Sequence, residues 1–193
     1  MSIPTTPSLS LDNFFFSPTD ASIAGYETNL IAAVRANDIA TMRNDYLRQN
    51  KTLDCCNRFG ESILHTACRR GATDMVRFLV EEAGVNVRVR DDYGRTALHD
   101  AFWTREPETA LVTILLRACP DLLYLTDKRG FTPLAYVRKN HHAVWCTYLD
   151  EHRDIVVPTS GLWEKSRGTG MKDNNGKNNS NGSIADTSVV VVG

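Results

Sequence analysis

Histidine and cysteine side chains are the groups in this sequence that could do chemistry, since they transfer protons, attack electrophiles and bind metal ions. His65 and His99 could act in catalysis or hold a metal. Cys55 and Cys56 are adjacent. They either have a redox role or simply lie in a loop between structural units. The sequence contains no glycine-rich phosphate loop, no nucleophile elbow and no HExxH motif. We therefore expect a protein that is not an enzyme.

A second group of possible ligands comprises His141, His142 and Cys146. A helix would place His142 and Cys146, four residues apart, on one face. Structural zinc takes four ligands, so two or three without a fourth make a poor site. The other interpretation puts Cys146 on a buried stripe with Leu149, and we favour it. We expect no bound metal and no cofactor.

Composition narrows the class of protein. The chain has 193 residues, with 22 Lys+Arg against 23 Asp+Glu and a formal net charge of −1. This balance excludes a generally basic nucleic-acid-binding protein but leaves local patches open. No run approaches the ~18 apolar residues of a membrane span, and the first residues lack the features of a secretion signal. We expect a cytoplasmic or nuclear protein with reduced cysteines, neither secreted nor bound to a membrane.

The two ends of the chain differ from its middle. Residues 1–25 carry three prolines and many Ser and Thr, and residues 158–193 are rich in Gly, Asn and Ser. Such segments bury too little apolar surface to offset the entropy of ordering, so we predict that both are disordered tails. The run Phe14-Phe15-Phe16 beside Ser17-Pro18 could dock a partner or fold back onto the first helices. The sequence leaves both alternatives open.

The middle of the chain repeats itself. The segment Gly60-Glu61-Ser62-Ile63-Leu64-His65 recurs 34 residues later as Gly94-Arg95-Thr96-Ala97-Leu98-His99. A third copy, Gly130-Phe131-Thr132-Pro133-Leu134, follows after a further 36 residues. Four units are marked by leucines at equivalent positions: Leu30, Leu64, Leu98 and Leu134. A period of this length is typical of solenoids, in which each unit packs on its neighbours.

Each unit is predicted to be two short helices followed by an extended finger. In the clearest unit, Ser62 caps a helix that runs to about Arg70, and Gly71 breaks it. A second helix is predicted from about Thr73 to Glu82, and an alternating stretch over 85–90 then leads to a turn at 91–94. The apolar stripes of the second helices in two units are Met75, Val76, Leu79 and Val80, then Leu111, Val112, Leu115 and Leu116.

With these residues, roughly positions 26–157 resemble the ankyrin-repeat family, whose units start with a Thr-Pro-Leu-His-like motif and have a period near 33. Thr132-Pro133-Leu134 matches the first three positions of the motif, and the two earlier copies match it imperfectly. The resemblance implies an all-α solenoid of stacked helix–turn–helix units with β-hairpin-like finger loops. The implied units are about 26–57, 58–91, 92–127 and 128–157. It further implies that His65 and His99, with the preceding Ser or Thr, hydrogen-bond the backbone of the neighbouring finger.

The resemblance also implies a concave face, lined by the finger tips and first helices, where a protein partner binds. The family's offsets from the turn glycine place fifteen side chains there: Arg58, Phe59, Glu61, Arg69, Arg70, Asp92, Tyr93, Arg95, Trp103, Thr104, Lys128, Arg129, Phe131, Lys139 and Asn140. Seven are basic, two acidic and four aromatic, a composition typical of interfaces, with a net charge of +5. The other interpretation is that Phe59, Tyr93 and Phe131 only pack between adjacent fingers and that the arginines are ordinary surface.

These features predict a non-catalytic interaction module: an adaptor, inhibitor or assembly factor. We expect it to bind a protein partner that carries an acidic segment, on the concave face, and to be monomeric without that partner. The alternative is a regulatory or accessory subunit of an enzyme that docks through its tails. A charge of +5 spread over three units is small for a surface that binds nucleic acid, so we do not expect a nucleic-acid partner.

Overall fold

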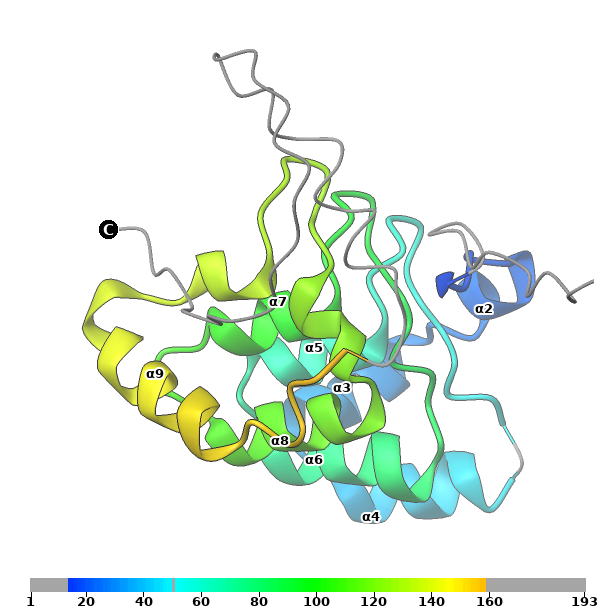
Figure 1. Ribbon diagram of the computed structural model, residues 1–193. Coiled ribbons are helices and arrows are strands. Elements are labelled where there is room, and N and C mark those ends of the chain that lie inside the picture. The colour runs from blue at the N-terminus through cyan, green and yellow to red at the C-terminus, as the bar shows by residue number, and fades with distance from the viewer. Residues whose placement is uncertain (1–13, 50, 159–193) are drawn as a thin grey trace, which may run out of the picture.

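The structure is a computed structural model that describes residues 14–49 and 51–158, and these residues form two layers of short helices with fingers projecting to one side (Figure 1). The inner helices are α3 (Thr28–Ala36), α5 (Ile63–Arg69), α7 (Ala97–Phe102) and the 3₁₀ turn η4 (Pro133–Tyr136). The outer helices are α4 (Ile39–Thr41) with the π-helical η1 (Met42–Leu47), α6 (Thr73–Arg77) with η2 (Phe78–Glu82), α8 (Thr109–Ala118) and α9 (His142–Glu151). The remaining elements are α2 (Asp20–Ala24), η3 (Pro120–Tyr124) and η5 (Lys139–His141).

Neighbouring units pack helix on equivalent helix, as a solenoid requires. The inner helix α5 contacts α3 on one side and α7 on the other, and the outer helix α6 contacts α8. Among the residues that the structure describes, extended pairing is limited to isolated bridges, and no helix is long and apolar enough to cross a membrane. The predicted all-α stack of helix pairs is therefore confirmed.

The predicted start and end signals of the helices act as expected. Ser62 caps α5: its hydroxyl lies 2.8 Å from Nδ1 of His65, and its backbone N–H donates to the same nitrogen at 3.2 Å. This is a capping box in which an imidazole takes the place of the usual Glu or Gln. Gly71 ends the helix with φ of +65°, and Gly84 ends the following helix with φ of +66°.

The core is one continuous cluster built from the repeated apolar positions. Three of the four marker leucines, Leu30, Leu64 and Leu98, are fully buried, whereas Leu134 is only partly buried. Every predicted stripe residue of α6, η2 and α8 is buried except Val80, which packs at the edge of the cluster. The last unit is therefore the thinnest part of the core.

The buried stripe of α9 differs from the prediction. Trp145 and Tyr148 face the core, and the Trp145 ring lies 4.6 Å from that of Phe102 on α7. Cys146 is exposed and Leu149 is only partly buried, so the predicted stripe through Cys146 and Leu149 is wrong. A shift of one residue turns a helix by about 100°, and the two large aromatic rings decide which face is buried.

Three fingers end in turns of the same construction. The first turn spans Asn57–Glu61, the second Asp91–Arg95 and the third Asp127–Phe131. The first side chain of each turn accepts two backbone N–H groups at 2.8–3.1 Å, from the residues two and four positions later. The glycine at the fourth position has a positive φ: +75° at Gly60, +78° at Gly94 and +86° at Gly130.

Adjacent fingers are joined through their backbones. The N–H of Asp92 donates to the carbonyl of Phe59 at 2.7 Å, and the N–H of Lys128 donates to that of Tyr93 at 2.9 Å. A Cβ atom at Gly60 would lie 2.9 Å from the carbonyl oxygen of Arg90, so the close approach of two fingers itself requires glycine. The finger backbones thus form a short ladder across the units.

The N-terminal segment packs on the second finger, which corrects the prediction of disorder for residues 14–25. Phe14 is buried, and the N–H of Phe16 donates to the carbonyl of Arg88 at 3.0 Å. The guanidinium of Arg88 lies 5.6 Å from the ring centres of both Phe14 and Phe16. Of the two alternatives for Phe14-Phe15-Phe16, the chain takes the fold-back, although onto a finger strand beside Val89 rather than onto the first helices.

The segment after α9 returns to the end of η3, just before the third finger, in a similar way. The hydroxyl of Tyr124 donates to the carbonyl of Val156, and Ile155 packs against the core. Tyr124 and Arg88 each lie six residues before the glycine of their finger turn, so both end segments contact equivalent positions. Residues 1–13 and 159–193, where the rest of the predicted tails fall, lie outside the described residues.

Candidate interaction surface

The fifteen residues predicted to bind a partner lie at the finger tips and next to them. The turns hold Arg58, Phe59, Glu61, Asp92, Tyr93, Arg95, Lys128, Arg129 and Phe131; the ends of α5 and α7 hold Arg69, Arg70, Trp103 and Thr104; η5 holds Lys139 and Asn140. We call this surface the finger face. Twelve of the fifteen are exposed, and Glu61 and Arg95 are half-buried.

Thr104 is the one predicted contact residue that does not belong to the surface. It is buried, and its hydroxyl lies 3.0 Å from the carbonyl oxygen of Ala101 and 2.7 Å from that of Glu106. Its role is to hold the turn after α7, where this unit has two more residues than the one before. The offset carried over from the family fails here because the inserted turn folds Thr104 inward.

The aromatic residues of the three finger tips are exposed, and each is paired with an arginine of its own finger. The exposed fractions are 48% for Phe59, 62% for Tyr93 and 48% for Phe131. The guanidinium carbon lies 4.7 Å from the ring centre in the Arg58–Phe59 pair, and 5.1 Å away in both the Arg95–Tyr93 and the Arg129–Phe131 pairs. The rings are therefore not sealed between fingers, and each cation–π contact holds an arginine flat beside an apolar surface.

Three of the arginines on this face already have carboxylate partners inside the chain. Arg69 lies 2.8 Å from both Glu61 and Asp100, Arg95 lies 2.6 Å from Asp91, and Arg129 lies 3.3 Å from Asp127. Asp91, Asp100 and Asp127 are buried and were not among the fifteen predicted residues. Counting them lowers the net charge of the face from +5 to +2. The signal for two of them was present in the sequence: an Asp three residues before the turn glycine.

The Asp127 carboxylate is fixed by the backbone of its own turn and by Tyr136. Burial alone would raise the pKa of Asp127, but the Tyr136 hydroxyl, 2.7 Å away, and the N–H groups of Phe131 and Arg129 outweigh burial and lower it. The Tyr136 hydroxyl also accepts from Nη2 of Arg129 at 2.9 Å. Arg129 is thus held within its own unit, even though its side chain is 64% exposed.

Four other basic residues of the finger face carry unmatched charge. Within residues 14–49 and 51–158, no Asp or Glu forms an ion pair with Arg58, Arg70, Lys128 or Lys139. All four are exposed. These side chains, rather than the paired arginines, supply the positive charge that an outside molecule would meet.

Sequence reasoning missed two residues beside Trp103. The indole of Trp103 is 55% exposed, the ring of Tyr136 meets it edge-on at 6.3 Å, and the guanidinium carbon of Arg138 lies 5.6 Å from its centre. Arg138 reaches this position because η4 is a single 3₁₀ turn, so the chain is extended again at Val137. The sequence predicts a full helix at this point of the fourth unit, so it does not predict that Arg138 lies beside Trp103.

The histidines are structural, as the resemblance implied. Nε2 of His65 lies 3.0 Å from the carbonyl oxygen of Arg95, and Nε2 of His99 lies 3.2 Å from that of Phe131. Since a carbonyl only accepts, Nε2 must carry the proton and Nδ1 must accept from the residue that caps the helix. Each His reaches the neighbouring finger itself, whereas the preceding Ser or Thr bonds the imidazole and not that finger.

The candidate metal and redox groups do not assemble into a site. His142 and Cys146 do share a helix, α9, but no cluster of three His, Cys, Asp or Glu side chains that could hold a metal occurs in the described part of the chain. All five cysteines fall within the described residues and are free thiols. Burial, followed by the nearby Cys56 sulfur, raises the pKa of the Cys55 thiol to about 12, which suppresses the reactive thiolate.

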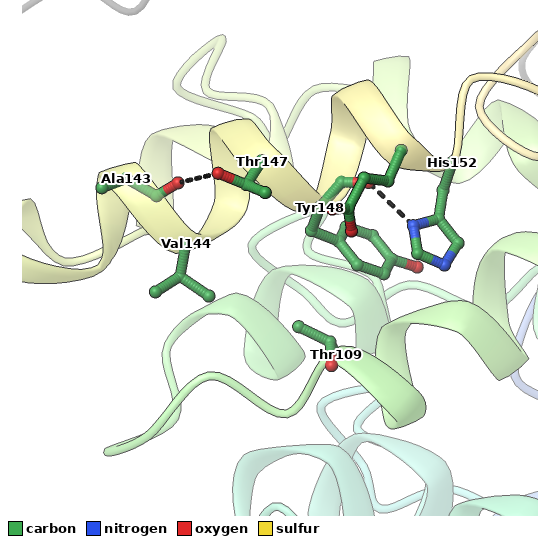
Figure 2. A pocket seen from close by; sticks show the side chains of 7 residues that line it. Thr109, Ala143, Val144, Thr147, Tyr148 and His152 are labelled. Atoms are coloured by element: carbon green, nitrogen blue, oxygen red, sulfur yellow. Dashed lines mark hydrogen bonds between the residues drawn. The ribbon is translucent and has the colours of Figure 1, made fainter.

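An open hollow lies between α8 and α9, on the outer layer and not on the finger face (Figure 2). Its volume is about 460 Å³. Two side chains of its wall are hydrogen-bonded to the backbone of α9: Thr147 donates to the carbonyl of Ala143 at 3.1 Å, and Nδ1 of His152 lies 2.9 Å from the carbonyl oxygen of Tyr148.

Known proteins identify the class to which this arrangement belongs. Residues 30–122 match the family model of ankyrin repeats, in three copies. These residues, just under half of the chain, therefore form ankyrin repeats, which are stacked units that present extended binding surfaces. The match ends before the fourth unit, in which the first helix is reduced to η4.

Three relatives of known name each match part of the chain. Putative ankyrin repeat protein YahD of Escherichia coli (strain K12) is 33% identical over 108 residues, 53% of this chain and 52% of the relative. The SMC5-SMC6 complex localization factor protein 1 of Bos taurus is 35% identical over 101 residues, 52% of this chain and 9% of the relative. The inhibitor of Bruton tyrosine kinase of Xenopus laevis is 34% identical over 102 residues, 48% of this chain and 7% of the relative. The chain therefore spans about half of YahD and less than a tenth of the other two.

Proposed function

We propose that the chain is a non-catalytic adaptor, inhibitor or assembly factor that holds an acidic segment of a protein partner on the finger face. The observation that carries the proposal is the row of exposed arginine–aromatic pairs, one on each finger tip. Arginine and aromatic side chains are enriched among the few residues that contribute most of the binding energy in protein interfaces, because aromatic rings bury large areas and arginine forms several hydrogen bonds at once. Fingers joined by backbone hydrogen bonds would present the three pairs as one rigid surface.

The charge of the proposed partner follows from the basic residues that have no partner inside the chain. Arg58, Arg70, Lys128 and Lys139 are exposed beside the aromatic rings. Carboxylates of a partner would form charge-assisted hydrogen bonds with them and would be steered to the face by its field. Two relatives support this class of function through their names alone, one as a localization factor and the other as an inhibitor.

Docking through the N-terminal segment is the weaker alternative. Phe14 is buried and Phe15 partly buried, so of the three phenylalanines only Phe16, 55% exposed, could meet a partner. Deleting residues 1–25 would remove part of the core together with any docking site. A clean test of this alternative is Phe16→Ala, which spares the buried ring.

The proposal is tested by capturing partners with the full chain as bait and comparing two charge-reversal variants. Arg58→Glu combined with Arg70→Glu changes the finger face without breaking an ion pair of the chain, whereas reversing Arg69 would break two. Arg48→Glu combined with Arg117→Glu makes the same change in charge on the outer helices. We expect the finger-face variant to lose the partner and the control to keep it.

Salt dependence provides the second readout. Association of the wild type should slow as salt rises, and the finger-face variant should show a flatter dependence. Equal binding by the wild type and the finger-face variant, for every protein captured by the wild type, would contradict the proposal. Loss of binding only in the outer-helix control would move the interface to the other side of the molecule.

A further inference from the structure

The third finger is the open end of the finger ladder. The turn carbonyls of Phe59 and Tyr93 each accept an N–H from the next finger, but the equivalent carbonyl, that of Arg129, has no such donor within the described ranges. The space beside the turn glycine shows the same difference. A Cβ atom would lie 3.0 Å from the backbone nitrogen of Lys128 at Gly94, whereas nothing lies within 4 Å at Gly130.

This end is not built to receive another finger of the same kind. In the two units before it, Nε2 of His65 and of His99 donates to a carbonyl of the following finger. The equivalent position in the fourth unit is Ala135, whose methyl group has nothing to donate. A further repeat stacked here would lack the side-chain bond that joins the others. Among the described residues, nothing occupies this edge, and an extended chain of a different kind could pair with it.

The charge around this edge is of one sign. Residues 128–140 contain four basic side chains and no acidic one: Lys128, Arg129, Arg138 and Lys139. The nearest carboxylate, that of Asp127, is only 1% exposed and is turned onto Arg129 and Tyr136. In the part of the chain that the structure describes, Lys128, Arg138 and Lys139 have no ion-pair partner. This is a segregated basic patch on a chain whose net charge is −1.

Exposed aromatic rings border the patch on two sides. Phe131 lies at the tip of the third finger, and Trp103 lies at the end of α7 with Arg138 above it. A segment in which apolar side chains alternate with acidic ones would meet both rings and cations on this surface. An unpaired backbone acceptor, a basic patch and flanking rings are the features of a surface that binds a peptide by strand addition.

We propose that the open edge of the third finger binds an extended acidic segment of the partner, whose backbone adds one rung to the ladder. An N–H of that segment donates to the carbonyl of Arg129, its carboxylates pair with Lys128, Arg138 and Lys139, and an apolar side chain covers Phe131. This inference rests on the proposed function and assigns the acidic segment to one end of the finger face. A peptide fits better than a nucleic acid because the carbonyl needs an N–H donor, which a phosphate backbone lacks.

Synthetic peptides test each element of the recognition with the full chain. The probe is a short capped peptide that alternates Glu with Val; in one control Gln replaces Glu, and in a second the backbone is N-methylated at every other residue. We expect the probe to bind by calorimetry and each control to bind about tenfold more weakly, because one lacks charge and the other lacks N–H donors. Equal binding of the probe and either control would overturn the proposal, as would no binding of the probe.

Two variants locate the binding. Lys128→Glu, Arg138→Glu and Lys139→Glu combined should weaken the Glu–Val peptide by about tenfold or more, and Arg58→Glu with Arg70→Glu should change it by less than about threefold. Lys128→Gln with Lys139→Gln, which leaves the Arg138–Trp103 contact in place, should weaken it in the same direction. A single-stranded oligonucleotide that binds the wild type more tightly than the peptide, and is lost in the triple variant, would assign the patch to nucleic acid and overturn the proposal.

The captured partner separates this inference from the proposed function. A partner that is lost with the Arg58 and Arg70 variant but kept by the triple variant would leave the proposed function standing and overturn the inference. A partner kept by both variants would contradict the proposed function itself. A partner lost with both variants supports both.

Discussion

His99 should make the stability of this protein depend on pH between about 4 and 6.5. Burial lowers the pKa of His99 from its ordinary 6.5 to about 4, against the opposing effects of the Phe131 carbonyl and of Asp127, Asp100 and Asp91. In this window the unfolded chain binds a proton that the folded chain does not. The free energy of unfolding therefore falls as the pH falls through the window, in total by on the order of 3 kcal/mol.

The variant His99→Gln isolates this contribution. A Gln three residues after Thr96 can still complete a capping box, so the helix start is kept while the titrating group is removed. Urea unfolding followed by circular dichroism at pH 7 and pH 5 gives the free energies. We expect the wild type to lose about 2 kcal/mol more than the variant over this interval, since most of the unfolded histidine is protonated by pH 5.

A matched substitution guards against a general effect of losing any histidine. His142→Gln changes a partly exposed residue of α9 that lies outside the cluster around His99. It should keep the pH dependence of the wild type. The reasoning would be refuted by equal losses in the wild type and His99→Gln, because the buried imidazole would then take up its proton as readily as the unfolded chain does.

Four further substitutions test the packing by urea unfolding. Gly60→Ala should lower the free energy of unfolding by about 3 kcal/mol, since the new Cβ meets the carbonyl of Arg90 at a residue with a positive φ. Gly130→Ala has open space beside it and should lower the free energy of unfolding by about 1 kcal/mol. Equal losses would mean that the fingers do not approach so closely. Leu98→Ala should cost about 2–5 kcal/mol, and a loss below about 1 kcal/mol would place Leu98 outside the core between units. Phe14→Ala should cost about 3 kcal/mol and speed proteolysis of the N-terminal segment; an unchanged midpoint would mean that this segment is not docked in solution.

The repeated part of the fold could be predicted because the units share one pattern of buried positions. Leu64 and Leu98 occupy one position 34 residues apart, and the spacing fixes which side of each helix is buried. The last unit follows this pattern of buried positions less closely. In that unit the prediction buried Cys146, whereas the structure buries its neighbour Trp145. The apolar residues of α9 are not confined to one face, so the large aromatic rings decide which face is buried.

The finger face could be predicted as a set of positions but not as a pattern of charge. The offsets placed Arg95 and Arg129 at the tips, yet whether each is free depends on carboxylates that the offsets do not include. The position of Arg138 depends on η4 being a single turn, which is a result of packing in the last unit. Local sequence specifies the turns, and contacts between segments decide which charges remain for a partner.

The bridge between Phe16 and Val89 has a consequence for the order in which the chain folds. It joins residues that lie about two repeat lengths apart, whereas the units themselves are held by contacts between neighbours. Local contacts form quickly, and a contact across such a separation must wait until its second half exists. During synthesis, residues 14–16 leave the ribosome long before residues 88–90. We therefore expect the segment at residues 14–16 to dock only after the second finger has formed, as a step separate from the stacking of neighbouring units.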